Sequence, residues 1–371
     1  MIAVPDAFAS SYAQARANFL KAAATAALPT RSFTQAEKGL EGEDLAMDVA
    51  FEGHTDAPYL LILSCGTQGA DGFAGSAIET FLLHDQEWHE RVKNSDVAVL
   101  YVHAVNPWGM SHLTFGDAQN INFVRNFVDF GKPLPANPGY EQLHEKALTP
   151  SWEISAESEA ATQEIIKKHG LHFLLNIHQR GQYSRPNGFY YGGTAPSWAH
   201  RQWRKLLQTY GQAAKRIAWV DMRRGWGVSS GQATLVANAS PSDEEAIDRA
   251  RDWWAAGDNT ALVARPDALQ TLIPFGTGNP VVSLAQECPQ AQYTGLAAYF
   301  SVVQSMQEIS FAARSAQWLQ AQAQPNADDT ARTHAMMRAV SFKADSTWQG
   351  PVISQGRQIA FQALQGLSKV A

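Results

Sequence analysis

Short apolar runs bounded by turn residues recur along the chain, and they are typical of strands buried on both faces of a sheet. They lie at 57–65, 95–107 and 171–179. Residues 279–288 form a further strand-like run, and residues 44–53 alternate like a strand with one solvent-facing side. Helical spacing marks the segments 10–27, 73–88, 155–170, 196–217 and 294–320. This alternation predicts an α/β fold with a mixed, mostly parallel, doubly wound sheet and helices on both faces.

A polar, proline-containing segment at 320–329 is typical of a linker. Two shorter helical patterns follow it, at 330–342 and 356–367. The sequence therefore predicts a main α/β domain over residues 1–322 and a helical C-terminal appendage over 323–371.

Composition narrows the classes of partner. Of the 371 residues, 45% are hydrophobic and 17% are charged, as in ordinary globular proteins. The net charge of -6 argues against nucleic acid or an anionic membrane surface as the main partner. No apolar run approaches the ~20 residues that cross a bilayer. The two cysteines imply no disulfide framework, and the N-terminus lacks a secretory pattern, so we expect a cytoplasmic protein.

Polar or glycine-rich residues directly follow the predicted strands. These are 67–72, 106–109, 178–183 and Glu287. Because ligands bind beyond the carboxyl ends of the strands in doubly wound sheets, we expect the functional site there.

The turn after the strand at 57–65 carries two polar residues flanked by glycines, Gln68 and Asp71. Side chains of this kind at a strand end suit a metal or anion site. They are equally suited to capping the following helix and bonding the turn.

The loop at 180–193 combines two arginines with three tyrosines. Arg180 and Arg185 would clamp a carboxylate, while Tyr183, Tyr190 and Tyr191 offer flat amphipathic contacts. The alternative is an ordinary tyrosine-rich loop packed on the sheet. Residues 221–237 have a similar mixture of arginine, tryptophan and glycine, and we expect them to form the opposite wall.

Three stretches resemble the zinc carboxypeptidase family, in particular a bacterial branch of carboxypeptidase-like proteins. They are "SCGTQGADGFAGSAIE" (64–79), "NPWGMSHLTFGDAQNINFVRNFVDF" (106–130) and "NIHQRGQYSRPNGFYYGGTAPSW" (176–198). The resemblance spans residues 44–322 and implies the carboxypeptidase-type α/β fold. It also implies metal-assisted hydrolysis of an amide, in which two histidines and a glutamate hold zinc and an open position holds water.

The resemblance assigns a role to each matching position. His178 stands at the third zinc-ligand position, while Gln68 and Asp71 stand at the first and second. Glu287 lies at or beside the position of the general base, and Arg125 matches an arginine that polarises the carbonyl. A salt bridge from Glu287 to Arg125 or Arg185 would explain this glutamate equally well. His178 is equally compatible with a structural histidine at a strand end.

Several family positions carry other residues, and these differences fall together. Glutamine replaces histidine at 68, and aspartate replaces glutamate at 71. The middle segment lacks the usual arginines and Asn-Glu, and Val124 replaces an asparagine. An amide oxygen is a weak ligand where zinc prefers imidazole, so zinc is not expected in the ordinary geometry.

Three functions remain open from the sequence. The first is a protein with a degenerate metal site that binds a small ligand or a peptide end without hydrolysing it. The second is a hydrolase of peptide or N-acyl amide bonds, in which His178, Asp71 and Gln68 hold another divalent metal such as manganese or magnesium. The third is a metal-free protein that binds a partner.

Overall fold

The computed structural model describes residues 2–146, 156–170, 180–226, 230–240, 243–254, 263, 279–302, 306–320 and 326–369. The strands are β1 (Thr30–Lys38), β2 (Asp44–Glu52), β3 (Tyr59–Cys65), β4 (Val97–His103), β5 (Arg216–Trp226), β6 (Ala233–Ala237) and β7 (Gln292–Val302). The helices up to β5 are α1 (Val4–Ala7), α2 (Tyr12–Thr25), α3 (Phe73–Leu82), α4 (Gln86–Lys93), α5 (Pro107–Ser111), α6 (Pro138–Lys146), α7 (Ala156–His169) and α9 (Trp198–Tyr210). Those after it are α10 (Glu244–Trp254), α11 (Val281–Glu287), α12 (Met306–Gln320), α13 (Ala327–Ser341) and α14 (Ser346–Ser368). Two short 3-10 turns, η1 (Gly69–Asp71) and η2 (Phe123–Arg125), complete the described elements.

The seven strands form one mixed sheet in the order β1-β2-β4-β3-β5-β7-β6. The central strands β4, β3, β5 and β7 are parallel to one another. The pairs β1–β2, β2–β4 and β6–β7 are antiparallel. Only β2 and β6 therefore run against the direction of the other five strands, so the predicted mixed, mostly parallel sheet is confirmed.

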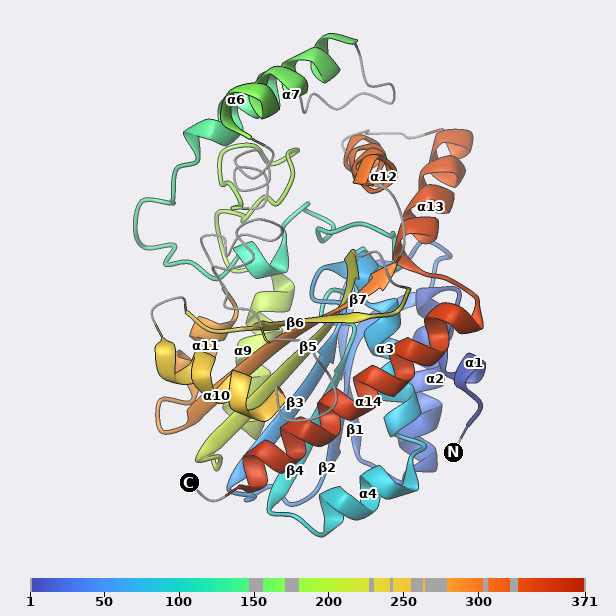
Figure 1. The fold of residues 1–371 in the computed structure, drawn as a ribbon, viewed down its shortest axis with the longest axis vertical. Helices are drawn as coiled ribbons and strands as arrows, with labels where there is room; N and C mark the ends of the chain where they lie inside the picture. The colour runs from blue at the N-terminus through green and yellow to red at the C-terminus, as the bar shows by residue number, and fades with distance from the viewer. Residues whose placement is uncertain are drawn as a thin grey trace.

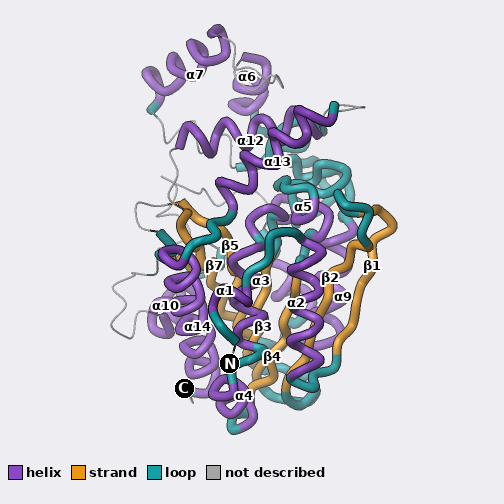
Figure 2. The backbone as a smooth tube through the Cα atoms, turned by 90° about the vertical axis from the view of Figure 1, so that its right-hand side faces the viewer, coloured by secondary structure: helices purple, strands orange, loops and turns teal. Residues whose placement is uncertain are grey.

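Helices cover both faces of this sheet (Figure 1). On one face, α3, α10 and α14 pack on the central strands, with side chains such as Leu61, Val220 and Ile353 in a common core. On the other face, α9 and α11 pack on the sheet through a core that includes Trp203, Trp219 and Leu284. Figure 2 shows the sheet between these layers, with α6, α7, α12 and α13 beyond one end of it. No helix among the described residues is long and apolar enough to cross a membrane.

Most of the predicted elements are confirmed, with changed limits. The helix expected over 73–88 is divided into α3 and α4, because the Asp85 side chain accepts hydrogen bonds from the backbone N–H groups of Glu87 and Trp88 and so caps a new helix. In β2 all residues after Asp44 are buried, so the expected solvent-facing side is wrong. The strand predicted at 171–179 lies outside the described residues.

The prediction was wrong over residues 279–302. Residues Val281–Glu287 form helix α11 rather than a strand, and Gln292–Val302 form strand β7 rather than the start of a helix. Both segments mix apolar residues with a few small polar ones, and so short a run does not reveal its period. β7 is buried from Thr294 to Val302 apart from Tyr299, because β5 and β6 flank it.

Helix α14 lies within the residues expected to form a C-terminal appendage, but it belongs to the core of the sheet. Its residues Val352, Ile359 and Ala363 are buried with side chains of β3 and β5. The indole N–H of Trp348 donates to the backbone oxygen of Ser301 at 3.0 Å. Figure 1 shows α14 crossing the face of the sheet.

Candidate functional site

A charged cluster lies beyond the carboxyl ends of the central strands, where the sequence predicted the site. It consists of Asp71, Arg125, Asp221, Arg223 and Arg224, each at most 6% exposed. Asp71 follows β3 in the η1 turn, and Arg125 ends the η2 turn. The other three residues belong to the last half of β5. Two tyrosines, Tyr190 and Tyr299, complete the surroundings of this cluster.

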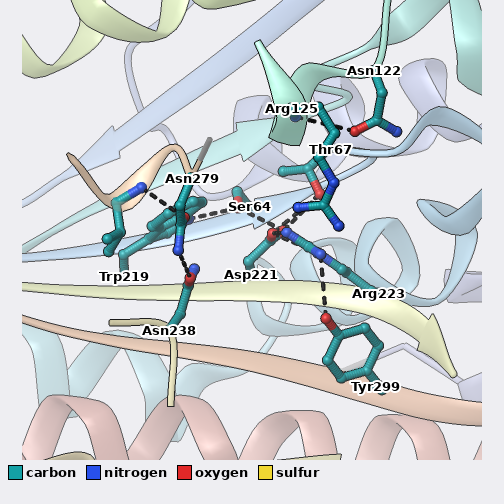
Figure 3. Close-up of polar contacts among 11 residues, drawn as sticks. Ser64, Thr67, Asn122, Arg125, Trp219, Asp221, Arg223, Asn238, Asn279 and Tyr299 are labelled. Carbon is teal, nitrogen blue, oxygen red and sulfur yellow. Dashed lines mark hydrogen bonds and ion pairs between the residues drawn. The ribbon is translucent and has the colours of Figure 1, made fainter. Parts of the chain in front are cut away.

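Within the cluster, Asp221 and Arg223 form a well-bonded ion pair (Figure 3). The Arg223 Nε atom donates to Asp221 Oδ2 at 2.7 Å, and the other carboxylate contacts are with the hydroxyls of Thr67 and Ser64, which lie 3.1–3.2 Å away. Arg223 Nη1 also donates to the Tyr299 hydroxyl at 3.3 Å. A buried charge costs several kcal/mol unless it is paired and hydrogen-bonded, and this pair meets that requirement.

Arg125 is buried without such a partner. It is 5% exposed, and its Nε atom makes no hydrogen bond. Among the described residues its guanidinium group forms no ion pair, and the centre of the Tyr190 ring lies 6.0 Å from it. Burial lowers the pKa of Arg125, and the positive charge of Arg223 lowers it further. Figure 3 shows the Arg125 side chain extending toward Asp221 and Arg223.

The tyrosine-rich loop fixes Arg125 in this position. The Tyr183 hydroxyl donates to the backbone oxygen of Arg125 at 2.7 Å. Gly181 has a φ of +86°, and a Cβ atom there would lie 2.8 Å from Arg125 Cδ, so the loop packs directly against the arginine side chain. Tyr190 has a φ of +49°, a conformation that is uncommon outside glycine. The loop is thus built around Arg125.

Asp71 is the second buried charge of this kind. It is 4% exposed, and its Oδ1 atom has no hydrogen-bond partner. Burial raises the pKa of Asp71 to about 7, although Arg223, Arg224 and the backbone N–H of Gln68 act in the opposite direction. Neither Gln68 nor Asp71 caps a helix, since the cap positions of η1 and α3 show no side-chain hydrogen bond.

The donors present around Asp71 do not fit a zinc ion. Zinc sites use histidine, cysteine and carboxylate ligands, and the described residues contain no group of three or more such side chains that could hold a metal. Gln68 offers only an amide. His178, the third predicted ligand, lies outside the described residues.

The other residues predicted to bind substrate have different surroundings. Arg185 is paired with Glu141, with its Nε atom 2.7 Å from the carboxylate, and Arg180 is exposed. Tyr191 lines a surface groove of about 540 Å³ together with Trp198 and Arg201. The structure therefore brings Asp71, Arg125, Tyr183 and Tyr190 together. It leaves Arg180, Arg185 and Tyr191 outside the cluster.

Glu287 is not brought to the cluster. It ends helix α11, five residues before β7 begins, and so lies at the amino edge of the sheet. Its carboxylate is ion-paired with Arg204 and accepts a hydrogen bond from Gln208 Nε2 at 2.6 Å. The predicted salt bridge is therefore present, but with Arg204 in place of Arg125 or Arg185. The expected position at the end of a strand was wrong because 281–287 is helical.

Sequence reasoning pointed to residues 221–237 as the opposite wall but did not single out Asp221 or Arg223. The signal was present: two charges of opposite sign at i and i+2 on one face of an otherwise apolar strand. Tyr299 was missed because its strand was expected to be a helix. It corresponds in register to Arg223 of β5, which places both on neighbouring strands at the same height.

Solved structures with a similar chain arrangement include carboxypeptidases, the class of protein that three stretches of the sequence resemble. Bovine thrombin-activatable fibrinolysis inhibitor in complex with tick carboxypeptidase inhibitor has 10% identity and a TM-score of 0.48, with 96% of each chain covered. Carboxypeptidase A from Helicoverpa armigera has 9% identity and a TM-score of 0.43, with 89% of this chain and 73% of that chain covered. A metallo-carboxypeptidase from Burkholderia cenocepacia has 11% identity and a TM-score of 0.37, with 82% and 66% covered. Likenesses this weak carry no conclusion about the chemistry of this chain.

The comparison with protein families gives the identity of the chain. None of the curated proteins matches it. One family matches residues 8–355, which include every residue of the charged cluster and the first part of α14. The chain therefore belongs to the family described as "Protein of unknown function (DUF2817)".

Proposed function

We propose that this protein binds a small ligand through a carboxylate group, such as a free small acid or a peptide end, and that Arg125 is the anchor. The observation that carries the proposal is the buried guanidinium group of Arg125, which forms no ion pair with a described residue. Arginine binds carboxylates through two parallel hydrogen bonds, which would satisfy this group. Tyr190 and Tyr299 would provide flat surfaces beside the ligand.

Electrostatics support an anionic group at this point. Arg223 already has Asp221 as its partner, yet its positive charge still acts on Arg125. Burial lowers the pKa of the Arg125 guanidinium group, and the charge of Arg223 lowers it further. Two guanidinium groups that lie close together repel each other in a medium of low dielectric constant. An anion beside Arg125 would offset both this repulsion and the cost of burial.

We further propose that the protein does not catalyse zinc-dependent hydrolysis, because the positions that hold zinc ligands in the resembled family carry other residues here. The support is the donor set, since a neutral amide at 68 stands beside a lone carboxylate at 71. Elemental analysis of protein purified without chelator tests this. About one zinc or manganese per chain, lost in His178→Ala, would contradict the proposal and favour a hydrolase of peptide or N-acyl amide bonds.

The binding proposal is tested with two arginine variants. Wild-type protein, Arg125→Met and Arg185→Met would be titrated with acetate, succinate and diglycine while the melting temperature is followed. Arg185 is the matched control, because it belongs to the loop that packs against Arg125 but is paired with Glu141. A ligand at about 100 times its Kd adds about 2.7 kcal/mol to the free energy of unfolding. We expect stabilisation of wild type and Arg185→Met, and none of Arg125→Met.

Two outcomes would contradict the proposal. One is an absence of stabilisation by every carboxylate in the wild type. The other is unchanged stabilisation of Arg125→Met, which would place the anchor elsewhere.

A further inference from the structure

The cluster holds a second unpaired charge, of the opposite sign to Arg125. The carboxylate of Asp71 is buried, its Oδ1 atom has no hydrogen-bond donor, and it forms no ion pair with any residue that the structure describes. An orphaned buried carboxylate is costly, as is an orphaned guanidinium group. The site therefore lacks a donor at Asp71 and an acceptor at Arg125.

These two charges do not satisfy each other. No ion pair joins them, although both belong to one buried cluster: the η1 turn, which carries Asp71, contacts β5, and the Arg125 side chain extends toward Asp221 and Arg223 of β5 (Figure 3). Burial raises the pKa of Tyr190 and of Tyr299; in both cases Arg125 acts to lower it and Asp71 to raise it. The Tyr190 ring lies 6.0 Å from the Arg125 guanidinium group. The two orphaned charges therefore belong to the same buried cluster, with Tyr190 beside it.

We infer that the ligand is an α-amino acid in its zwitterionic form, with its carboxylate on Arg125 and its ammonium group on Asp71. This inference rests on the proposed function, to which it adds the second anchor. One molecule then supplies the acceptor that Arg125 lacks and the donor that Asp71 lacks. An ammonium group has three donors and bonds strongly to a carboxylate.

The charges of the cluster restrict the ligand further. Three guanidinium groups and two carboxylates leave an excess of positive charge among Asp71, Arg125, Asp221, Arg223 and Arg224. A ligand with an ammonium group but no carboxylate would add to this excess, so an amino-acid amide should bind poorly. An N-acetylated amino acid keeps the carboxylate and loses the ammonium group, so it should bind through Arg125 alone.

The test compares three forms of one ligand. Binding of each of the twenty common amino acids to the full chain would be measured by isothermal titration calorimetry. The tightest binder would then be compared with its N-acetyl derivative and its amide. We expect the amino acid to bind about 10- to 100-fold more tightly than the N-acetyl derivative, the range of one charged hydrogen-bonded pair, and the amide not to bind.

Two aspartate variants assign the effect. Asp71→Asn keeps the shape of the side chain and removes its charge, while Asp56→Asn is the control at an exposed position before β3, at the opposite edge of the sheet. Asp71→Asn should lower the affinity for the amino acid about 10- to 100-fold and leave the affinity for the N-acetyl derivative unchanged. Asp56→Asn should change neither affinity.

The outcomes separate this inference from the proposed function. If the N-acetyl derivative binds as tightly as the amino acid, or if Asp71→Asn keeps full affinity for the amino acid, the inference is overturned and carboxylate binding at Arg125 stands. If acids and peptides bind but no amino acid does, the inference is likewise overturned. If neither amino acids nor other carboxylates bind, both proposals fall.

Discussion

The two edges of the central sheet treat buried charge in opposite ways. At the amino edge, Glu287 is paired with Arg204, and Glu52 contacts His89 at 2.7 Å and Tyr101 at 2.8 Å. At the carboxyl edge, Arg125 and Asp71 are more deeply buried and each leaves a polar atom without a partner. The chain thus pairs its charges at the amino edge, whereas at the carboxyl edge it pairs Asp221 with Arg223 but leaves Arg125 and Asp71 each with an unsatisfied atom.

This difference between the two edges indicates which buried charges have a role other than stabilising the fold. Paired charges at the amino edge are neutral or favourable to folding. Orphaned buried charges lower the free energy of unfolding, and proteins retain such costs mainly at functional sites. The contrast makes the carboxyl edge the candidate for ligand binding, and it can be tested on the free protein.

The largest effect is expected for Arg223→Met, which would leave the Asp221 carboxylate without its ion-pair partner. Asp221 is fully buried and would lose its ion pair, although Thr67 and Ser64 would remain. We expect a loss of about 3–5 kcal/mol in the free energy of unfolding, measured by urea denaturation. A loss below about 1 kcal/mol would show that the hydroxyls alone satisfy Asp221.

The second effect is a pH dependence that originates at Asp71. Burial raises the pKa of Asp71 from 3.8 to about 7, so in this window the folded protein holds a proton that the unfolded chain has released. The free energy of unfolding therefore falls as the pH rises from about 4 to about 7. Asp71→Asn lacks this pH-dependent contribution. Between about pH 4 and pH 7 its free energy of unfolding should therefore rise relative to that of the wild type, by at most about 4 kcal/mol.

Urea titrations of both proteins at a series of pH values measure this difference directly. Other titrating groups are common to the two proteins and cancel in the comparison. A constant difference between pH 4 and pH 8 would mean that Asp71 has an ordinary pKa, and hence a partner.

The third effect is a gain. Arg125→Met removes a buried cation without a partner, and methionine fills much of the same volume. We expect the free energy of unfolding to rise by about 1–3 kcal/mol, in contrast to the same substitution at Arg223. A loss of stability comparable to that of Arg223→Met would mean that Arg125 is satisfied in the free protein and would remove the contrast between the two arginines.

The smallest effect is expected at the amino edge. The Arg204 side chain is 43% exposed, so its ion pair with Glu287 is screened by solvent. Arg204→Gln should change the free energy of unfolding by less than about 1 kcal/mol and leave ligand binding unchanged. Loss of binding in this variant would connect Glu287 to the site after all.

Much of the fold could be predicted because the central strands carry long apolar runs between polar turns, as in 57–65 and 95–107. Strands β1, β5 and β6 were not predicted, and the start of β5 was expected to end a helix. In 279–302 helix and strand were interchanged, because short runs of mixed apolar and small polar residues do not reveal their period and tertiary contacts decide between the two. The candidate site was located by the rule that ligands bind at the carboxyl ends of strands; Asp71 was singled out by its turn and by resemblance, and Arg125 by resemblance alone. Their lack of partners could not be predicted, because it depends on distances between segments far apart in the chain.

Helix α14 has a consequence for how the protein forms. It packs on β3 and β5, so the face of the sheet that it covers is completed by residues 346–368, almost 300 positions after β3. During synthesis, the apolar face of β3 and β4 would therefore stay exposed to water until residues 346–368 have left the ribosome. We expect such a chain to reach its native state slowly and to depend on chaperones that shield apolar strands during that interval.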